Sequence, residues 1–332
     1  MEEKVNKKSI SVIIPNYNGK HLLESYLPSV INALDFEKID FEIIIIDDCS
    51  KDDSVSFLTI NYPKIILLQN QINLGFSKTC NFGILKAQKE LIFLLNSDVK
   101  LEVDYFSAQW KYFNDPKTYG VMGRIMNFDG KKIEDAARFP RFKGSKFKAN
   151  AFYYSENDNE KVYTTYLSGA NSLVDRQKLL LLNGFDEIYS PFYFEDFDLG
   201  LRAWQMGWFS YYEHQSVCYH RVSASTNNMN KSNFVKITYN RNSFILQAIH
   251  LKKWKKRIWY LQLFSTTLFD HLYKGEFWIL KSINQFMKMK NQIEISKKNI
   301  LDLQKKLNSE QTIESIIDII TESIKTKKIN WL

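Results

Sequence analysis

Residues 91–98 read LIFLLNSD, and this stretch decides the fold class. Five apolar residues run directly into Asn96, Ser97 and Asp98. An unbroken apolar run of this length is typical of a strand buried on both faces, as in a parallel sheet covered by helices. Its polar end then lies at the carboxyl edge of a central strand, where open α/β sheets bind ligands. There Asp98 can either cap a turn or pair with a divalent metal, because a desolvated carboxylate needs a partner.

The residues before this stretch alternate between strand and helix patterns. We expect strands at 10–15, 41–46, 65–68 and 91–95, and helices at about 20–33, 54–61 and 76–88. This alternation favours an α/β fold with a right-handed, doubly wound parallel sheet. Neither G-x-G-x-x-G nor G-x-x-x-x-G-K-[ST] occurs, so a nucleotide would be held by carboxylates and polar turns at strand ends.

The pattern is less regular after residue 100. We expect a helix at 104–114, strands at 120–126, 169–174, 209–212 and 217–220, and helices at 176–182 and from residue 195. Residues 128–160 are polar, basic and aromatic without a sustained period, which predicts a long loop or lid. Residues 195–204 read EDFDLGLRAW. Their acidic residues fall in the first helical turn, where the helix dipole favours negative charge.

The composition is that of an ordinary globular protein. The 332 residues are 45% hydrophobic and 25% charged, which allows one large domain with an appendage or two domains. Three widely spaced cysteines give neither a disulfide framework nor a zinc pattern, so a reducing cytosol fits. The first apolar run is too short for a signal peptide, and no stretch approaches the length of a membrane span. We therefore expect a cytoplasmic location.

The positive charge belongs to the last third of the chain. Residues 1–230 hold 26 Lys+Arg and 29 Asp+Glu, whereas residues 231–332 hold 19 and 8. We predict a catalytic domain at 1–230, a polar linker at 223–233 and a basic amphipathic helical region at 231–332. That region either packs on the catalytic domain or a partner subunit, or lies on an anionic membrane surface with Trp254, Trp259 and Tyr260 at the interface. Nucleic-acid binding is not expected, because no recognised module occurs.

Three acidic clusters end predicted elements, and together they indicate chemistry. They are Asp47 with Asp48, Asp98 alone, and Glu195 with Asp196. A single carboxylate at a strand end is often only a turn former. Three clusters at one sheet edge could accept a hydrogen bond from a base, hold a metal on a diphosphate and act as a general base.

These residues carry a resemblance to family 2 glycosyltransferases of the GT-A fold. The matching segments are SVIIPNYNG (11–19), IIIIDDCSKDDS (43–54), NLGFSKTCNFGI (73–84), LLNSD (94–98), SGANSLVDRQKLLLLNGFDE (168–187), FEDFDLGLRAWQMGW (194–208) and YHRVSAS (219–225). They follow the order and spacing of the family over about residues 10–225. Asn96 stands where the family's metal-binding DxD motif has its first carboxylate, as in rhamnosyltransferase-like branches.

The resemblance implies a role for each candidate residue. Asp47 would accept a hydrogen bond from the base ring, which suits uracil or thymine. The other implied nucleotide-binding residues are Pro15, Asn16, Tyr17, Asn18, Asp48, Asn73, Gly75, Asn96 and Ser97. Asp98 would hold Mg²⁺ or Mn²⁺ on the diphosphate, and His220 is either a further metal or diphosphate contact or a structural residue. Arg202 would pair with the acidic block or bind phosphate; the alternative is a purely structural pair with Asp198 one helical turn away.

The acidic pair of the later helix would perform the proton transfer. By the same resemblance, Asp196 takes the proton of the acceptor hydroxyl and Glu195 positions the acceptor or shares the role. The predicted enzyme is an inverting glycosyltransferase that uses a nucleotide-sugar donor, with UDP or dTDP favoured, and a glycan or lipid-linked glycan acceptor. It would be cytoplasmic or peripheral on the inner face of the cell membrane.

Two alternatives stay open. A sugar-phosphate nucleotidyltransferase would keep the fold, but residues 15–19 lack its glycine-rich basic loop. A non-catalytic glycan-binding or assembly protein would also keep the fold, and the intact Glu195–Asp196 pair is evidence against it.

Overall fold

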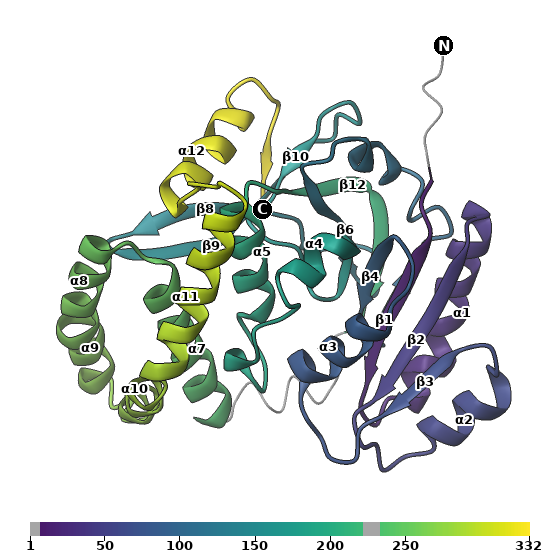
Figure 1. Cartoon of the computed structure of the whole chain (residues 1–332), viewed down its shortest axis with the longest axis horizontal. Coiled ribbons are helices and arrows are strands. Elements are labelled where there is room, and N and C mark those ends of the chain that lie inside the picture. Colours follow the sequence, from purple (N-terminus) through teal and green to yellow (C-terminus); the bar gives the residue numbers. More distant parts are fainter. Residues whose placement is uncertain (1–6, 222–232) are drawn as a thin grey trace.

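The computed structural model describes residues 7–221 and 233–332, and it has a large mixed sheet at its centre (Figure 1). The predicted first four strands are confirmed as parallel neighbours, with their order and bounds as follows: β4 (Leu91–Leu95), β1 (Ile10–Asn16), β2 (Phe41–Asp47) and β3 (Ile66–Gln69). The predicted helices between them are α1 (Lys20–Glu37), α2 (Ser54–Asn61) and α3 (Phe76–Lys86). All five residues of β4 are buried, as the apolar run predicts.

The other half of the sheet runs partly against the first. Strand β11 (Asn171–Asp175) is antiparallel to β4 and to β6 (Thr118–Asn127). Beyond β6 lie the parallel β12 (Phe209–His220) and the short β10 (Val162–Tyr163), while β5 (Val99–Leu101) pairs with β12. Two short strands were expected at 209–212 and 217–220. They form one strand, because an irregularity in register between Glu213 and Val217 lets the same strand continue along β6.

The prediction of a loop or lid at 128–160 is wrong. This segment holds β7 (Ile133–Asp135), β8 (Ala137–Lys143) and β9 (Lys146–Tyr154), and β13 (Asn330–Trp331) adds to β9 as an edge strand. On β9, Phe147, Ala149 and Tyr153 are buried, and Lys146 and Lys148 flank Phe147 at the alternate positions. The strand alternation is therefore present, but basic residues hide it, and its pairing partner β13 lies far away in the sequence.

The prediction of a helix at 104–114 is also wrong over most of its length. The structure has turns there and the short 3₁₀ helix η1 (Trp110–Asn114). Aromatic side chains of this segment are buried in different directions: Phe106 packs on Phe93 at a centroid distance of 5.0 Å, and Trp110 Nε1 donates to Glu37 at 2.9 Å. Tertiary packing overrides helical propensity here.

Helices α4 (Arg176–Leu181) and α5 (Glu195–Gln205), with the short η2 (Glu187–Tyr189) between them, complete the part before residue 222. The chain resumes with α7 (Asn233–His250), α8 (Lys253–Gln262), the π-helical η3 (Leu263–Thr267), α9 (Leu268–Tyr273), α10 (Trp278–Lys288), α11 (Lys290–Lys306) and α12 (Ile313–Ile324). Figure 1 shows α8, α9 and α10 together at the end of the molecule away from α1 and α2. No helix of the described ranges is long and apolar enough to cross a membrane.

One hydrophobic core joins a face of the sheet to the C-terminal helices. It contains Ile44 of β2, Phe197 of α5, Ile245 of α7 and Ile320 of α12. A second core fills the other face beneath α1. Residues 222–232 lie outside the described residues. They include the predicted domain boundary at 230, the end of the quoted YHRVSAS segment with Ser225, and the predicted linker at 223–233 except for Asn233, which begins α7.

Candidate active site

The ends of β1 and β2 meet at one edge of the sheet, as predicted. Asn16 lies opposite Asp47 in the parallel register, and Asn16 Nδ2 donates to Asp47 Oδ1 at 2.9 Å. The other carboxylate oxygen of Asp47 accepts from the Ser50 backbone N–H at 2.9 Å. Both residues are buried. The protein itself therefore already engages both oxygens of Asp47.

The turn after β1 is fastened to the loop after β2. The Asn18 backbone N–H donates to Ser50 Oγ at 2.8 Å, and Asn18 Oδ1 accepts from the Lys51 N–H at 2.6 Å. Pro15 pairs with Ile46 at the end of the β1–β2 ladder, and its ring is half-buried. The side chain of Tyr17 is 53% exposed, so its ring is free to stack on a ligand.

Asp48 organises the turn that contains Asn73 and Gly75. Its Oδ1 accepts from Asn70 Nδ2 and from the Leu74 N–H, both at 2.8 Å, and its Oδ2 accepts from the Gly75 N–H at 2.9 Å. Gly75 has a φ of 80°, which favours glycine. A Cβ there would lie 3.3 Å from the carbonyl oxygen of Pro191. This turn therefore lies against the loop that leads into α5.

The end of β4 lies beside the end of β1. A Cβ on Gly19 would be 2.4 Å from Asn16 Oδ1 and 3.5 Å from Ser97 Oγ. The Asn96 backbone N–H donates to the carbonyl oxygen of Ala170 at 3.2 Å, which leaves the side chains of Asn96 and Ser97 half-buried at the sheet edge. The structure thus brings together the predicted residues of all three strand ends.

Asp98 and His220 lie together, although they are far apart in sequence. Asp98 Oδ2 is 3.4 Å from His220 Nε2, and His220 Nδ1 is 3.4 Å from Glu134 Oε2. Burial lowers the pKa of His220, but the hydrogen bonds and charges of Asp98 and Glu134 outweigh it, so the pKa is raised overall. Glu134 is a neighbour that sequence reasoning missed, because it lies in the segment expected to be a loop.

The donor set at Asp98 fits a divalent metal only in part. Asp98 Oδ1 is buried without a hydrogen-bond partner. Mn²⁺ accepts both carboxylate oxygens and imidazole nitrogens as ligands, so Asp98 and His220 are of suitable chemical types. Within residues 7–221 and 233–332, no group of three or more His, Cys, Asp or Glu side chains is arranged to hold a metal. A metal here would need further oxygens from a ligand or water.

The Glu195–Asp196 pair begins α5, after a strained stretch of backbone. Tyr193 and Phe194 have φ values of 74° and 76°, which is unusual for bulky residues. Glu195 is buried and its Oε2 has no hydrogen-bond partner, whereas Asp196 Oδ1 accepts from the Phe197 N–H at 2.7 Å. Strain and an unsatisfied carboxylate in one turn are typical of a functional site.

Burial raises the pKa of both carboxyl groups. For Glu195 the charge of Asp196 adds to the effect of burial. For Asp196 burial is the largest cause, and the Arg138 guanidinium opposes it without cancelling it. Both carboxyl groups therefore titrate nearer to neutral pH than ordinary carboxyls, which suits proton transfer.

A cavity of about 430 Å³ opens at this pair, between α5, α7 and the β8–β9 hairpin. Besides Glu195 and Asp196, its lining includes Arg138, Lys146, Phe147, Lys148, Tyr166, Tyr193, Phe194 and Tyr239. The Arg138 guanidinium lies 4.5 Å from the centre of the Tyr166 ring and pairs with Asp135. The sequence did not indicate Arg138, because its segment was expected to be a loop. Recognition of β8 as a strand would have singled out Arg138 as a charged residue next to its buried positions.

Helix α7 holds the loop before the pair. Asn242 Nδ2 lies within hydrogen-bond distance of three carbonyl oxygens, those of Tyr189 (2.6 Å), Phe192 (2.9 Å) and Tyr193 (2.9 Å). Nothing in the sequence around Asn242 indicates this role, since the partners lie about fifty residues earlier.

Asp198 pairs with Arg202 inside α5, which confirms the helical-pair interpretation. Asp198 Oδ2 accepts from Arg202 Nε at 2.6 Å, and Asp198 Oδ1 lies 2.8 Å from His250 Nε2 of α7. The remaining Arg202 nitrogens donate to the carbonyl oxygens of Leu182 and Gly184. With these contacts Arg202 serves the packing of α5 rather than a phosphate.

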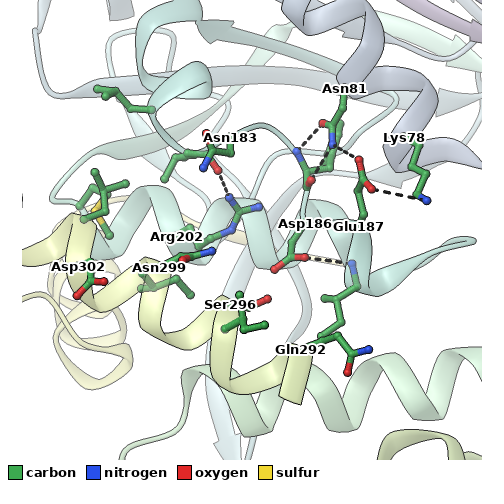
Figure 2. Close-up of a pocket in the computed structure, with 18 of the residues that line it drawn as sticks. Lys78, Asn81, Asn183, Asp186, Glu187, Arg202, Gln292, Ser296, Asn299 and Asp302 are labelled. Atoms are coloured by element: carbon green, nitrogen blue, oxygen red, sulfur yellow. Dashed lines mark hydrogen bonds and ion pairs between the residues drawn. The ribbon is translucent and has the colours of Figure 1, made fainter. Parts of the chain in front are cut away.

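A larger cavity of about 840 Å³ lies between α3, residues 181–188, α5 and α11 (Figure 2). Figure 2 shows Arg202 and Asp186 close to Asn299 and Ser296 of α11. Apart from Arg202, whose side chain is engaged by Asp198 and two carbonyl oxygens, its lining contains none of the residues predicted to bind nucleotide, phosphate or metal or to act as base. We therefore take the sheet edge and the smaller cavity as the candidate active site.

The sequence matches a known family. The model of glycosyl transferase family 2 matches residues 11–180, about half of the chain. Poly(ribitol-phosphate) β-N-acetylglucosaminyltransferase TarS of Staphylococcus aureus is 32% identical over 94 residues, or 26% of this chain and 16% of TarS. Chondroitin synthase of Pasteurella multocida is 25% identical over 219 residues, or 64% of this chain and 20% of that protein. The matched stretches thus span at most a fifth of these relatives.

Solved structures share the fold over most of the chain. GalNAc-T7 with UDP, GalNAc and Mn²⁺ matches 97% of this chain and 58% of its own, with a TM-score of 0.64 and 14% identity. Residues 1–349 of S. aureus TarS with UDP-GlcNAc match 90% of both chains, with a TM-score of 0.55 and 16% identity. The mannosyltransferase of Pyrobaculum calidifontis with GDP-Man and Mn²⁺ matches 96% of this chain and 86% of its own, with a TM-score of 0.54 and 14% identity.

Proposed function

The chain belongs to glycosyl transferase family 2, and we propose that it moves one sugar from a nucleotide-sugar donor to a hydroxyl of a glycan or lipid-linked glycan, with inversion. One observation carries the proposal. The Glu195–Asp196 pair lines a cavity, and the loop before the pair lies against the turn that Asp48 holds at the sheet edge of Asn16 and Asp47. The contact between Gly75 and Pro191 joins the two.

Asp196 is the proposed general base. As the acceptor oxygen bonds to the anomeric carbon, the bond from that carbon to the diphosphate breaks and its electron pair leaves with the nucleoside diphosphate. The acceptor proton passes to the Asp196 carboxylate, and attack from the opposite face inverts the configuration. The raised pKa of Asp196 supports this role, because a base is most effective when its pKa approaches the working pH. Glu195 would orient the acceptor hydroxyl.

The sheet edge is the proposed donor site. Tyr17 would stack on the base and Asp47 would accept its N–H, which favours UDP or dTDP, while Asp48 fixes the turn that approaches the ribose. Pro15, Asn16, Asn18, Asn73, Gly75, Asn96 and Ser97 would line the rest of the nucleotide pocket. Two of the solved neighbours hold UDP or UDP-GlcNAc, and one holds GDP-Man.

Asp98, with His220, would hold Mg²⁺ or Mn²⁺ at the donor diphosphate. The orphaned Asp98 Oδ1 supports this assignment, and two solved neighbours contain Mn²⁺. When bound, such a metal stabilises the negative charge of the departing diphosphate as a Lewis acid.

We further propose that the C-terminal region contacts an anionic membrane surface on the cytoplasmic side. Trp254, Ile258 and Leu261 of α8 are exposed apolar residues, and lysines and Arg257 surround them. Helices of this kind lie in the lipid interface. Of the three aromatic residues expected at that interface, Trp254 is exposed, whereas Trp259 is buried in the core and Tyr260 is half-buried, so the proposed contact rests on Trp254.

The test combines a donor screen with a base variant. Thermal shifts with UDP-, dTDP- and GDP-sugars and Mn²⁺ should identify one donor nucleotide, and release of its diphosphate in the presence of glycan acceptors should report transfer. Asp196→Asn should abolish transfer and leave nucleotide binding within about twofold. Transfer by Asp196→Asn at close to the wild-type rate would contradict the assignment of the base.

A further inference from the structure

We propose that the cavity at Asp196 contains a subsite for a phosphate group of the acceptor, formed by Lys146 and Lys148 of the β8–β9 hairpin. The inference rests on the proposed function, since it concerns the acceptor of that reaction. The phosphate could belong to a phosphodiester-linked polyol or to a lipid diphosphate, and the test below separates these sources.

The hairpin concentrates positive charge without carboxylates. Residues 137–154 include five cations and no Asp or Glu, although residues 1–230 are slightly acidic overall. The cations are Arg138, Arg141, Lys143, Lys146 and Lys148. Such a local excess within an acidic part of the chain indicates an anionic partner.

Strand register places like charges opposite each other near the hairpin turn. Arg141 lies opposite Lys148, and Lys143 lies opposite Lys146. Like charges in directly opposed positions destabilise an antiparallel pair. The two like-charged pairs do not stabilise the hairpin, whereas a bound anion would reduce the charge repulsion in both.

Lys146 and Lys148 differ from Arg138 in having no counter-ion. Arg138 is paired with Asp135, but no ion pair within the described residues neutralises the two lysines. Burial, followed by the charge of Lys148, lowers the pKa of Lys146 to about 8. Burial and then the charges of Lys143 and Arg141 lower the pKa of Lys148. The charged form of both lysines is thus disfavoured in the free protein, and a bound anion would stabilise it.

The backbone that carries the two lysines is fixed in advance. Phe147, which lies between them, donates from its N–H to Gln247 Oε1 and accepts from Gln247 Nε2, both at 2.9 Å. At the turn, the Ser145 N–H donates to Gln262 Oε1 at 3.1 Å. Helices α7 and α8 therefore hold the hairpin, and binding would not have to order it.

The lining of the cavity also places the phosphate relative to the reacting hydroxyl. Lys146 and Lys148 line the same cavity as Glu195 and Asp196, together with the rings of Tyr166 and Tyr239. An acceptor with its hydroxyl at Asp196 and its phosphate at the lysines would fill both parts. Lysine is a flexible point charge that suits phosphate oxygens.

The test measures binding separately from transfer. The probes are a short polyol phosphodiester oligomer, a short-chain prenyl diphosphate-linked sugar and the uncharged glycan of equal length. Each is titrated calorimetrically into the full chain saturated with UDP and Mn²⁺, so that the proposed donor site is occupied. One phosphate probe should bind, more weakly as salt increases, and the uncharged glycan should bind at least about tenfold more weakly.

Variants assign the site to the two lysines. The double variant Lys146→Gln/Lys148→Gln should lose about tenfold in affinity for the phosphate probe. Lys64→Gln, at an exposed lysine outside both the hairpin and the cavity lining, should change it less than about twofold. Lys146→Arg/Lys148→Arg should retain binding. All variants should bind UDP like the wild type.

The outcomes separate the two proposals. Equal binding of charged and uncharged probes, or equal binding by wild type and the double glutamine variant, would overturn the phosphate subsite even if transfer is observed. Selective, lysine-dependent binding without transfer from any nucleotide sugar would support the subsite and contradict the proposed function.

Discussion

The side-chain amide of Asn242, on α7, lies 2.9 Å from the carbonyl oxygen of Tyr193. Tyr193 and Phe194 have left-handed backbone angles directly before Glu195 and Asp196. The same amide reaches the carbonyl oxygens of Tyr189 and Phe192. A helix from the last third of the chain thus holds the strained loop that aims the proposed base.

Asn242→Ala should impair transfer more than its effect on folding explains. Loss of the buried donor should lower the unfolding free energy by about 1–3 kcal/mol and let the 189–194 loop relax, reducing kcat by at least about tenfold. Asn240→Ala is the control, since the Asn240 amide bonds within α7 to the Lys236 carbonyl. Urea unfolding and steady-state kinetics at a temperature where both variants are folded provide the measurements. An unchanged kcat in Asn242→Ala would show that the loop keeps its conformation without the amide.

The Asp198–Arg202–His250 cluster should make stability depend on acid pH. Burial alone would raise the pKa of Asp198, but Arg202 and His250 lower it from 3.8 to about 2. The interactions of the Asp198 carboxylate with Arg202 and His250 therefore contribute stability that is fully present above about pH 4 and is lost as pH falls toward 2. The contribution at neutral pH is about 2–3 kcal/mol.

Asp198→Asn removes that contribution and leaves the Arg202 charge buried. The unfolding free energy at pH 7 should fall by about 3–5 kcal/mol, and its decrease between pH 4 and pH 2 should become shallower. The control Asp302→Asn removes an exposed carboxylate of α11 and should stay within about 0.5 kcal/mol of wild type. Parallel pH profiles for wild type and Asp198→Asn would refute the linkage.

Glu195→Gln should stabilise the protein while it weakens the reaction. Because burial and Asp196 raise the folded-state pKa of Glu195, its ionisation costs stability as pH rises from its ordinary value of 4.5. The neutral glutamine avoids that cost. We expect a gain of at least about 1 kcal/mol at pH 9 that disappears near pH 4, with a reduced kcat/KM. Urea unfolding at the two pH values measures it, and a glutamine variant less stable than wild type at pH 9 would contradict the buried, unpaired state of Glu195.

The sequence predicted the first half of the sheet because each strand there is a short apolar run followed by polar residues. Residues 91–95 are the clearest case, since all five are buried. The strand ends converge because parallel neighbours share an edge, which is why Asn16 and Asp47 meet. Local pattern and topology suffice for that part.

The acceptor side could not be predicted in the same way. The β8–β9 hairpin has lysines and arginines between its buried residues, and its edge partner β13 lies about 180 residues later. Arg138 and Asn242 act on the site through contacts between segments separated by fifty or more residues. Such contacts depend on tertiary packing, which a single sequence does not encode as a local pattern.

Asp98 should couple donor binding to a divalent metal. Removing its carboxylate in Asp98→Ala takes away the charged oxygen ligand, so the gain in UDP affinity on adding Mn²⁺ should fall by about tenfold or more. Calorimetric titration of UDP with Mn²⁺ and with a chelator measures this gain. Asp104→Ala is the matched control, because Asp104 is exposed and lies shortly after Asp98 in the chain, beyond β5. If wild type binds UDP equally with Mn²⁺ and with chelator, Asp98 has no metal role.

The exposed apolar face of α8 should bind anionic lipid. Trp254, Ile258 and Leu261 are 59%, 48% and 72% exposed, and the basic residues of 252–257 lie among them. Insertion of the apolar side chains and attraction between lysines and phosphatidylglycerol would act together.

In liposome co-sedimentation, wild type should bind vesicles with roughly 30–40% anionic lipid more strongly than neutral vesicles. Trp254→Ser/Leu261→Ser should lose most of this binding while keeping its melting temperature. The exposed pair Ile60→Ser/Ile72→Ser, near the other end of the sheet, controls for a general loss of surface hydrophobicity. Equal sedimentation of wild type and the α8 double variant would leave α8 without a membrane role.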